Sequence, residues 1–172
     1  ARQRLSDLKC QVLTIPTNFS DLKEALQNEG IYEVDGFIFD LGVSSYQLDT
    51  PERGFSYMND GPLDMRMNKE APLTADEVVN EYDAEALLQI IRDYGEERWA
   101  KRIVEFIVNA RQEKRITTTG ELVRIIKQAI PAKARQDGPH PAKRTFQAIR
   151  IEVNRELAIL HDSFVDAVSM LK

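Results

Sequence analysis

The chain has 172 residues, of which 42% are hydrophobic and 30% are charged, and its formal net charge is −5. This composition is ordinary for a globular protein, and the length suits one compact domain, with or without a small insertion. No run approaches the roughly 18 apolar residues of a membrane span, and no signal-peptide pattern is recognisable. Cys10 is the single cysteine and cannot form an internal disulfide. We therefore expect a protein without a membrane segment in the reducing cytoplasm.

Charge is distributed unevenly along the sequence. Residues 20–97 contain 5 Lys and Arg against 19 Asp and Glu, whereas residues 98–155 contain 14 against 5. Phosphate contacts need clustered cations rather than a positive whole-chain charge, so the second segment favours a nucleic-acid partner. The alternative is a solvated helical surface that pairs with the acidic segment, and the charge pattern alone leaves both interpretations open.

The first quarter of the chain predicts a β-α-β unit. Residues 1–8 have the pattern of the end of a helix, and Gln11–Pro16 that of a short strand. Ser20–Asn28 follows as a helix, and Val34–Leu41 is the clearest strand, since its apolar core does not alternate with polar residues. Such a run is typical of a parallel sheet covered by helices on both faces. Two strands are too few for a stable sheet, so we expect these strands to need partners from outside the chain.

Residues 42–72 have little apolar periodicity and many turn formers, which predicts a long functional loop. Helical patterns follow it. The predicted helices begin at the Thr74–Glu77 capping box, at Asp83, at Glu97, at the Thr118–Glu121 capping box and at about residue 144. The fourth should end at Pro131, because proline cannot continue the hydrogen bonding of a helix. Apolar residues recur at helical spacing from Phe146 to Leu171, so we expect the last helix to be unbroken over residues 144–171.

Three residues near the predicted strand ends could contact a ligand, because ligands of open α/β sheets bind beyond the carboxyl ends of the strands. Asp40 follows a buried apolar run and must find donors, either in the next turn or on a ligand. Phe19 could face an adenine ring or belong to the core, and Gln47 could meet a polar ligand edge or solvent. A serine hydrolase that uses Ser44 or Ser45 is a weak alternative, because no Gly-x-Ser-x-Gly elbow surrounds them.

Several longer strings carry a resemblance to a known family. In chain order they are Asp40–Ser45 (DLGVSS), Gln47–Asp49 (QLD), Glu52–Ser56 (ERGFS), Asp60–Met67 (DGPLDMRM), Tyr94–Arg98 (YGEER) and His140–Ile151 (HPAKRTFQAIRI). Together they resemble the signature of the MraW/RsmH methyltransferase family. The resemblance implies an α/β fold, with a partial class I (Rossmann-like) methyltransferase sheet and an inserted all-helical domain. It also implies S-adenosylmethionine as cofactor, and methylation of the N4 amine of a cytosine in the decoding region of 16S ribosomal RNA within the small ribosomal subunit.

The same resemblance implies the domain limits and the cofactor contacts. Residues 1–72 and 139–172 would form the partial methyltransferase domain, and residues 73–138 the inserted helical domain. Phe19, Asp40 and Gln47 match the family's cofactor-binding residues. The glycine-rich cofactor loop is expected upstream of residue 1, and a later Ser-Phe-His-Ser-Leu-Glu-Asp segment beyond residue 172. We therefore expect a fragment that holds part of the cofactor pocket and lacks activity by itself.

The RNA-facing residues are predicted from charge and from the resemblance. The candidates for phosphate contacts are Lys101, Arg102, Lys114, Arg115, Lys133, Arg135, Lys143 and Arg144. The target base must be unstacked to react, and Phe55 and Tyr57 could pack around it or merely anchor the loop. Asp60 and Asp64 could accept a proton or brace the loop through Arg53 or Arg66, so no general base is assigned. The alternative function is a non-catalytic RNA-binding helical module.

Overall fold

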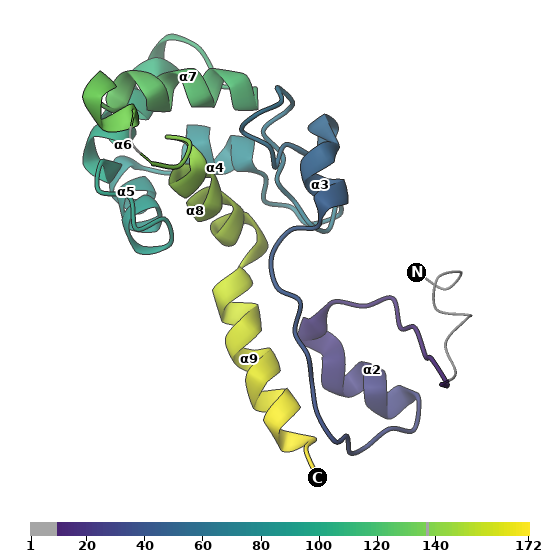
Figure 1. Cartoon of the computed structure of the whole chain (residues 1–172). Helices are drawn as coiled ribbons and strands as arrows, with labels where there is room; N and C mark the ends of the chain where they lie inside the picture. Colours follow the sequence, from purple (N-terminus) through teal and green to yellow (C-terminus); the bar gives the residue numbers. More distant parts are fainter. Residues whose placement is uncertain (1–9, 137) are drawn as a thin grey trace. The chain divides into compact units, whose positions relative to one another are not determined.

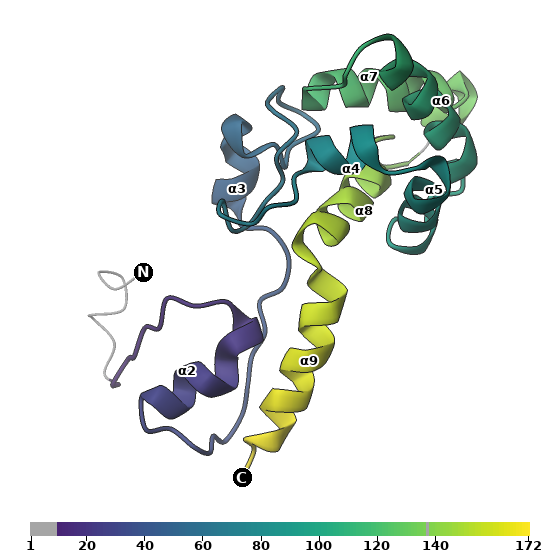
Figure 2. The same cartoon turned by 180° about the vertical axis from the view of Figure 1, so that it is seen from behind.

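A computed structural model describes residues 10–136 and 138–172 (Figures 1 and 2). The chain forms two compact units. The first unit consists of residues 1–40 and 157–172, and the second of residues 41–156. The helix end expected at residues 1–8 lies outside the described residues. The helical elements are η1 (Phe19–Asp21), α2 (Leu22–Asn28), α3 (Ser45–Asp49), η2 (Pro51–Arg53), α4 (Ala75–Glu81), α5 (Ala84–Asp93), α6 (Ala100–Glu113), α7 (Thr119–Ala129), η3 (Ala132–Arg135), α8 (Lys143–Asn154) and α9 (Glu156–Ser169).

The first unit is held by a small apolar cluster between α2 and α9. Leu22, Ala167 and Met170 are buried in it, and Phe37 and Phe39 pack against them. In the described residues of this unit, the backbone adds one parallel bridge between Val34 and Leu171, in which the Val34 amide donates to the Met170 carbonyl at 2.9 Å.

Neither predicted strand forms in the described part of this unit. Residues 11–16 have no regular structure, and the segment 34–41 pairs only at the Val34 bridge. Ile38, in the middle of the apolar run, is 100% exposed. A strand is stable when neighbours satisfy its backbone groups and cover its side chains, and residues 10–136 and 138–172 supply no such neighbours here. The sheet of the expected α/β fold is accordingly not seen in the described residues.

The second unit encloses a helical core. Helix α8 packs against α4 and α5, and α6 packs against α5 and α7. Side chains such as Ile103, Ile107, Leu122 and Ile149 are completely buried among these helices. No helix in the described part of the chain is long and apolar enough to cross a bilayer.

The predicted starts of three helices in this unit are confirmed. Thr74 and Glu77 form a capping box at α4, and Thr118 and Glu121 form another at α7. The Asp83 carboxylate accepts the Ala86 amide at 2.8 Å and so caps α5. These side chains satisfy backbone donors that have no partner inside the helix. Helix α7 ends at residue 129, just before Pro131, as predicted.

The prediction of an unbroken helix over residues 144–171 is wrong. Arg155 adopts a left-handed conformation, with φ of 49°, and separates α8 from α9. The Arg150 guanidinium pairs with the Glu156 carboxylate across this break, with an Nε–Oε1 distance of 2.6 Å. The boundary between the two units also lies here, after residue 156. The domain limits implied by the resemblance, at 72/73 and 138/139, stay a prediction.

Candidate functional site

The segment between η2 and α4, which carries the Asp60–Met67 string and the end of the Glu52–Ser56 string, is tied to the helices by hydrogen bonds. The Leu63 amide donates to the Thr117 carbonyl at 3.1 Å, and the Thr119 amide donates to the Gly61 carbonyl at 2.8 Å. Asn154 at the end of α8 donates to the Met65 carbonyl at 2.8 Å. Its amide oxygen accepts the amide of residue 67 at 2.7 Å. Residues 61–67 are therefore attached to the start of α7 and to the end of α8.

Two glycines permit this close packing. Gly54 has a left-handed φ of 70°, and a Cβ there would overlap the Pro62 carbonyl oxygen. A Cβ on Gly61 would overlap the Pro51 carbonyl oxygen. Glycine has no Cβ, so it can adopt the positive φ found at Gly54 and can lie directly against another backbone segment at both positions.

Asp60 and Asp64, the two carboxylates of the Asp60–Met67 string, brace this segment. Asp64 receives Nε and Nη2 of Arg66 at 2.9 and 2.8 Å. Burial opposes its ionisation, but the hydrogen bonds from Arg66 hold the pKa of Asp64 below its usual value. Asp60 accepts the Gly120 amide at 2.8 Å, and this bond lowers the pKa of Asp60. Of the two alternatives left open by the sequence, Asp64 has the bracing contact with Arg66, while Asp60 braces the start of α7 and contacts neither arginine.

The predicted cofactor residues keep groups that can meet a ligand. Phe19, in the first unit, is 37% exposed and makes an edge contact with Phe39 at 6.2 Å between centroids. Asp40 is the last residue of the first of the two stretches that form the first unit, and it is exposed, with no hydrogen-bond partner among the described residues. In the second unit, the amide oxygen of Gln47 accepts the Ser44 amide at 2.9 Å in a capping box, which leaves the amide nitrogen as a donor.

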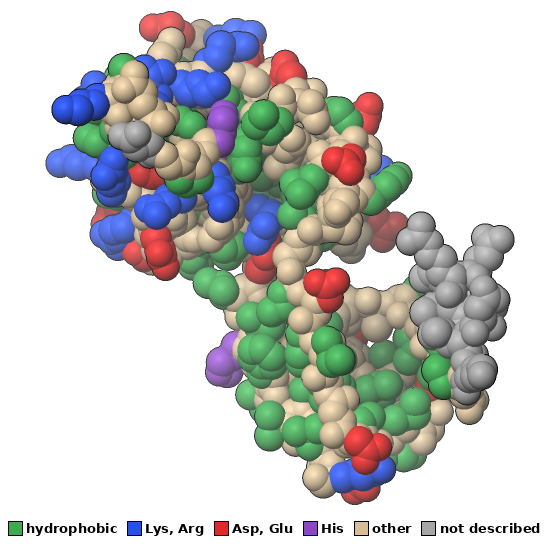
Figure 3. Space-filling view, in the orientation of Figure 1, with side chains coloured by type: hydrophobic (Ala, Val, Ile, Leu, Met, Phe, Trp, Pro, Cys, Tyr) green, Lys and Arg blue, Asp and Glu red, His purple; other side chains and the backbone are tan. Residues whose placement is uncertain are grey.

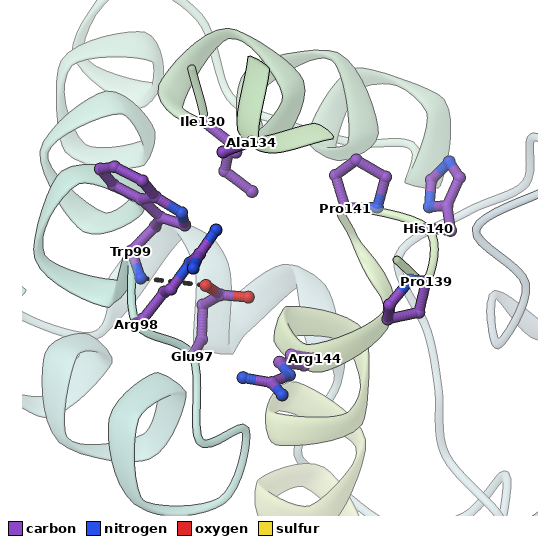
Figure 4. Close-up of a pocket in the computed structure, with 9 residues that line it drawn as sticks. All are labelled: Glu97, Arg98, Trp99, Ile130, Ala134, Pro139, His140, Pro141 and Arg144. Atoms are coloured by element: carbon purple, nitrogen blue, oxygen red, sulfur yellow. Dashed lines mark hydrogen bonds between the residues drawn. The ribbon is translucent and has the colours of Figure 1, made fainter. Parts of the chain in front are cut away.

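One cavity of about 220 Å³ lies among η3, α8 and the turn before α6. Figure 4 shows Trp99, Arg98 and Glu97 on one wall and Pro139–Pro141 on the other. Glu97 is buried, and its carboxylate accepts the Trp99 amide at 2.9 Å. The indole Nε1 of Trp99 is buried and has no hydrogen-bond partner in the described residues. Burial and the nearby Lys127 lower the pKa of His140, so this side chain is neutral near pH 7.

A second cavity, of about 210 Å³, lies between α8 and the segments before α4. The residues of α8 that line it share one helical face, with spacing i, i+3, i+4 and i+7: Lys143, Phe146, Gln147 and Arg150. The opposite lining comes from the signature strings and from the residue that follows one of them: Val43, Leu48, Phe55 and Tyr57.

The predicted phosphate contacts divide into two groups. Lys114 pairs with Glu121 at 2.9 Å, and Arg115 pairs with Asp76 and Glu81, so phosphate would have to displace carboxylates from both. The other six are exposed on α6, η3 and the first turn of α8: Lys101, Arg102, Lys133, Arg135, Lys143 and Arg144. Figure 3 shows Lys and Arg side chains gathered on the part of the face that belongs to these later helices.

Sequence reasoning missed several contacts in this site. Ser44 and Gln47 follow the same capping-box pattern as the two boxes that were predicted, and that signal was available in the sequence. Asn154, which holds the segment 65–67, and the unpaired indole of Trp99 have no comparable signal. The partners of Asn154 lie far away in the sequence, so only the folded structure brings them together.

Comparisons with known proteins agree with the resemblance. The sequence pattern of the MraW methylase family matches residues 1–172, so the chain belongs to that family. The chain is 56% identical over 171 residues to the ribosomal RNA small subunit methyltransferase H of Clostridioides difficile (strain 630). It is 55% identical over 172 residues to the protein of the same name from Ruminiclostridium cellulolyticum. Each match covers 99% of this chain and 55% of the relative, so the chain spans about half the length of the curated relatives it matches.

Proposed function

We propose that the natural protein containing this chain methylates the N4 amine of a cytosine in the decoding region of 16S ribosomal RNA. The observation that carries the proposal is the match to a methylase family over residues 1–172, with relatives named for methylation of small-subunit ribosomal RNA. Membership of a methylase family favours an enzyme over a non-catalytic RNA-binding module. The target cytosine and its N4 atom come from the sequence resemblance. A cytoplasmic location follows from the same proposal, since ribosomal subunits are found there.

S-adenosylmethionine is the proposed methyl donor, and Phe19, Asp40 and Gln47 are its proposed contacts. The chemistry of these side chains suits the cofactor. Phe19 has an exposed ring for the adenine, Asp40 has a carboxylate that can accept from hydroxyl or amino groups, and Gln47 has an amide nitrogen that can donate. When bound, S-adenosylmethionine would supply an electrophilic methyl group.

The contribution of the protein to such a reaction is mainly positioning. An exocyclic cytosine amine is a poor nucleophile, because its lone pair is delocalised into the ring, and it must be held in line with the methyl group. A carboxylate or carbonyl close to the amine would accept its proton. Asp64 accepts hydrogen bonds from Arg66, and Asp60 accepts one from the Gly120 amide. We therefore assign both carboxylates to bracing residues 60–67 and neither to the role of general base.

The reaction can be tested on small ribosomal subunits that lack the modification. We expect the natural protein, with S-adenosylmethionine, to produce N4-methylcytidine in the decoding region, as read by mass spectrometry of nuclease fragments. Methylation at ring carbon C5, or no methylation of the subunit, would contradict the proposal.

The cofactor site can be tested by calorimetry on the natural protein. We expect Asp40→Asn to weaken S-adenosylmethionine binding by about tenfold or more, since each lost 1.4 kcal/mol is a factor of ten. Asp49→Asn, the same change at an exposed position of α3, serves as the control and should bind as the wild type does. Equal affinities for the two variants would remove Asp40 from the site.

A further inference from the structure

The second cavity combines aromatic walls with a cationic rim. Phe55 and Phe146 are almost completely buried, with 5% and 4% of their surface exposed, and both line the cavity. Tyr57 stands beside them, edge-on to Phe146 at 5.8 Å between centroids. Lys143 lies in the first turn of α8 and is exposed, with no ion-pair partner among the described residues.

The rings are fixed before any ligand arrives. Tyr57 stacks on His140 at 4.7 Å with 11° between the ring planes, so neighbouring side chains hold it. Arg53 lies 5.7 Å from the centre of the Phe55 ring and also donates to the carbonyls of Arg66 and Met67. Rigid aromatic walls bind a flat ring without the entropy loss of ordering the site.

Polar groups mark the edge of the cavity. Gln147 lines it, and its amide nitrogen makes one long hydrogen bond of 3.3 Å, to the Tyr94 carbonyl, which leaves its amide oxygen to accept. Arg150 is neutralised by Glu156, so Lys143 is the lining cation that has no carboxylate partner among the described residues. An apolar ring slot next to an unpaired cation fits a base attached to a phosphate.

The size of the cavity limits the ligand. A volume of about 210 Å³ lies below the roughly 300 to 1,000 Å³ of sites for drug-sized molecules. It suits a single small ring system rather than a whole nucleotide. The excess of positive charge in residues 98–155, which include α8, favours a polyanionic carrier of that ring over an apolar peptide.

We propose that this cavity receives an unstacked pyrimidine base of the RNA substrate, with Phe55, Tyr57 and Phe146 around the ring and Lys143 on the adjoining phosphate. The inference rests on the proposed function, because it takes ribosomal RNA as the substrate. It extends the proposed function by giving the place in the second unit where the base binds. Leu48 and Gln147 lie at the rim of this cavity.

Cross-linking tests the location without relying on methylation. The probe is a decoding-region RNA oligonucleotide with 5-iodocytidine at the target position, irradiated with the natural protein and analysed by mass spectrometry. We expect the cross-link on a peptide that contains Phe55 or Tyr57. Leu48→Trp fills the cavity from its rim and should lower the cross-link yield about tenfold. Asn109→Trp adds the same bulk on the exposed side of α6 and should leave the yield unchanged.

Folding and activity controls separate the possible results. Both Trp variants should keep the melting temperature and the S-adenosylmethionine affinity of the wild type, and Tyr57→Phe should keep the cross-link, since its ring remains. A cross-link confined to other peptides, no cross-link at all, or an equal yield from Leu48→Trp would overturn the inference. A cross-link at Tyr57 from a protein that methylates no cytosine would support the cavity and reject the proposed reaction.

Discussion

The second unit of the chain encloses its apolar side chains, whereas the first leaves many of its own in solvent. In the second unit, helices that follow each other along residues 75–154 cover the completely buried Ile103 and Ile149. In the first, Phe164 is 45% exposed and Val168 is 68% exposed, although both lie on the helix that contributes to its core. Apolar residues alone do not close a core; the chain must also supply surfaces that cover them.

The largest expected difference between the units is in the cost of truncating an isoleucine. In the 172-residue chain, Ile149→Ala should lower the free energy of unfolding by about 2 to 5 kcal/mol, because it opens a cavity in a closed core. Ile38→Ala should change it by less than about 0.5 kcal/mol, because the side chain is fully exposed. Urea unfolding measures both. Equal effects would show that residue 38 is packed and would break the comparison.

A smaller effect is expected where one side chain holds the signature segment to the second unit. Asn154→Ala leaves the Met65 carbonyl and the amide of residue 67 without their partner, at a cost of about 2 kcal/mol in unfolding free energy. Asn109→Ala, on the exposed side of α6, is the matched control and should be neutral or slightly stabilising. If both variants unfold at the same urea concentration, the segment does not depend on Asn154.

The basic surface of the second unit predicts a severalfold effect on RNA binding. Lys143→Ala should weaken binding of a small-subunit RNA helix and reduce the salt slope of the affinity by about 1. Lys114→Ala should have a smaller effect, since Lys114 already pairs with Glu121. Lys23→Ala, in the first unit, should leave the slope unchanged. Filter binding across salt concentrations measures this, and equal slopes for Lys143→Ala and Lys23→Ala would place the RNA elsewhere.

The smallest effect concerns acid stability at the start of α7. Hydrogen bonds from the Thr117 amide and from Lys114 lower the pKa of Glu121 to about 2 from 4.5. A lowered folded-state pKa stabilises the protein above about pH 4.5, and that stability is lost as the pH falls toward 2. Glu121→Gln should therefore be less stable at pH 7 by under about 1 kcal/mol. In urea unfolding, the difference in unfolding free energy between the variant and the wild type should shrink as the pH falls below 4.5. A difference that does not depend on pH would exclude a role for the Glu121 charge.

The helices could be predicted where the signal is local. The capping boxes at Thr74 and Thr118 and the stop at Pro131 depend on residues within one turn, and the structure confirms them. The break at Arg155 has no such signal, because apolar spacing continues across it and neither glycine nor proline interrupts it. It coincides with contacts made by Asn154 to a segment nearly 90 residues earlier.

The sequence predicts which kinds of residue form the site better than it predicts which side chains contact one another. The basic residues of 98–155 were recognised as a group, but the sequence does not reveal that Arg115 meets Asp76, which lies 39 residues earlier. The cavity beside α8 combines strings that the sequence shows separately, with Phe55 and Phe146 as its walls. The Val34–Leu41 pattern predicts a strand, but only the Val34 bridge forms in the described residues, because a strand also needs neighbours that a local pattern does not specify.

The division of the chain into units also sets an order for folding during synthesis. The second unit is one continuous stretch, residues 41–156, whereas the first joins residues up to 40 with residues 157–172. A ribosome that adds about 5 to 20 residues per second needs roughly 6 to 23 s to synthesise the stretch between the two parts of the first unit. During that interval the second unit can fold. Phe37 and Phe39 cannot yet pack against the cluster to which α9 contributes, because α9 has not been synthesised. The exposed apolar run around them is then a natural target for chaperones on the nascent chain.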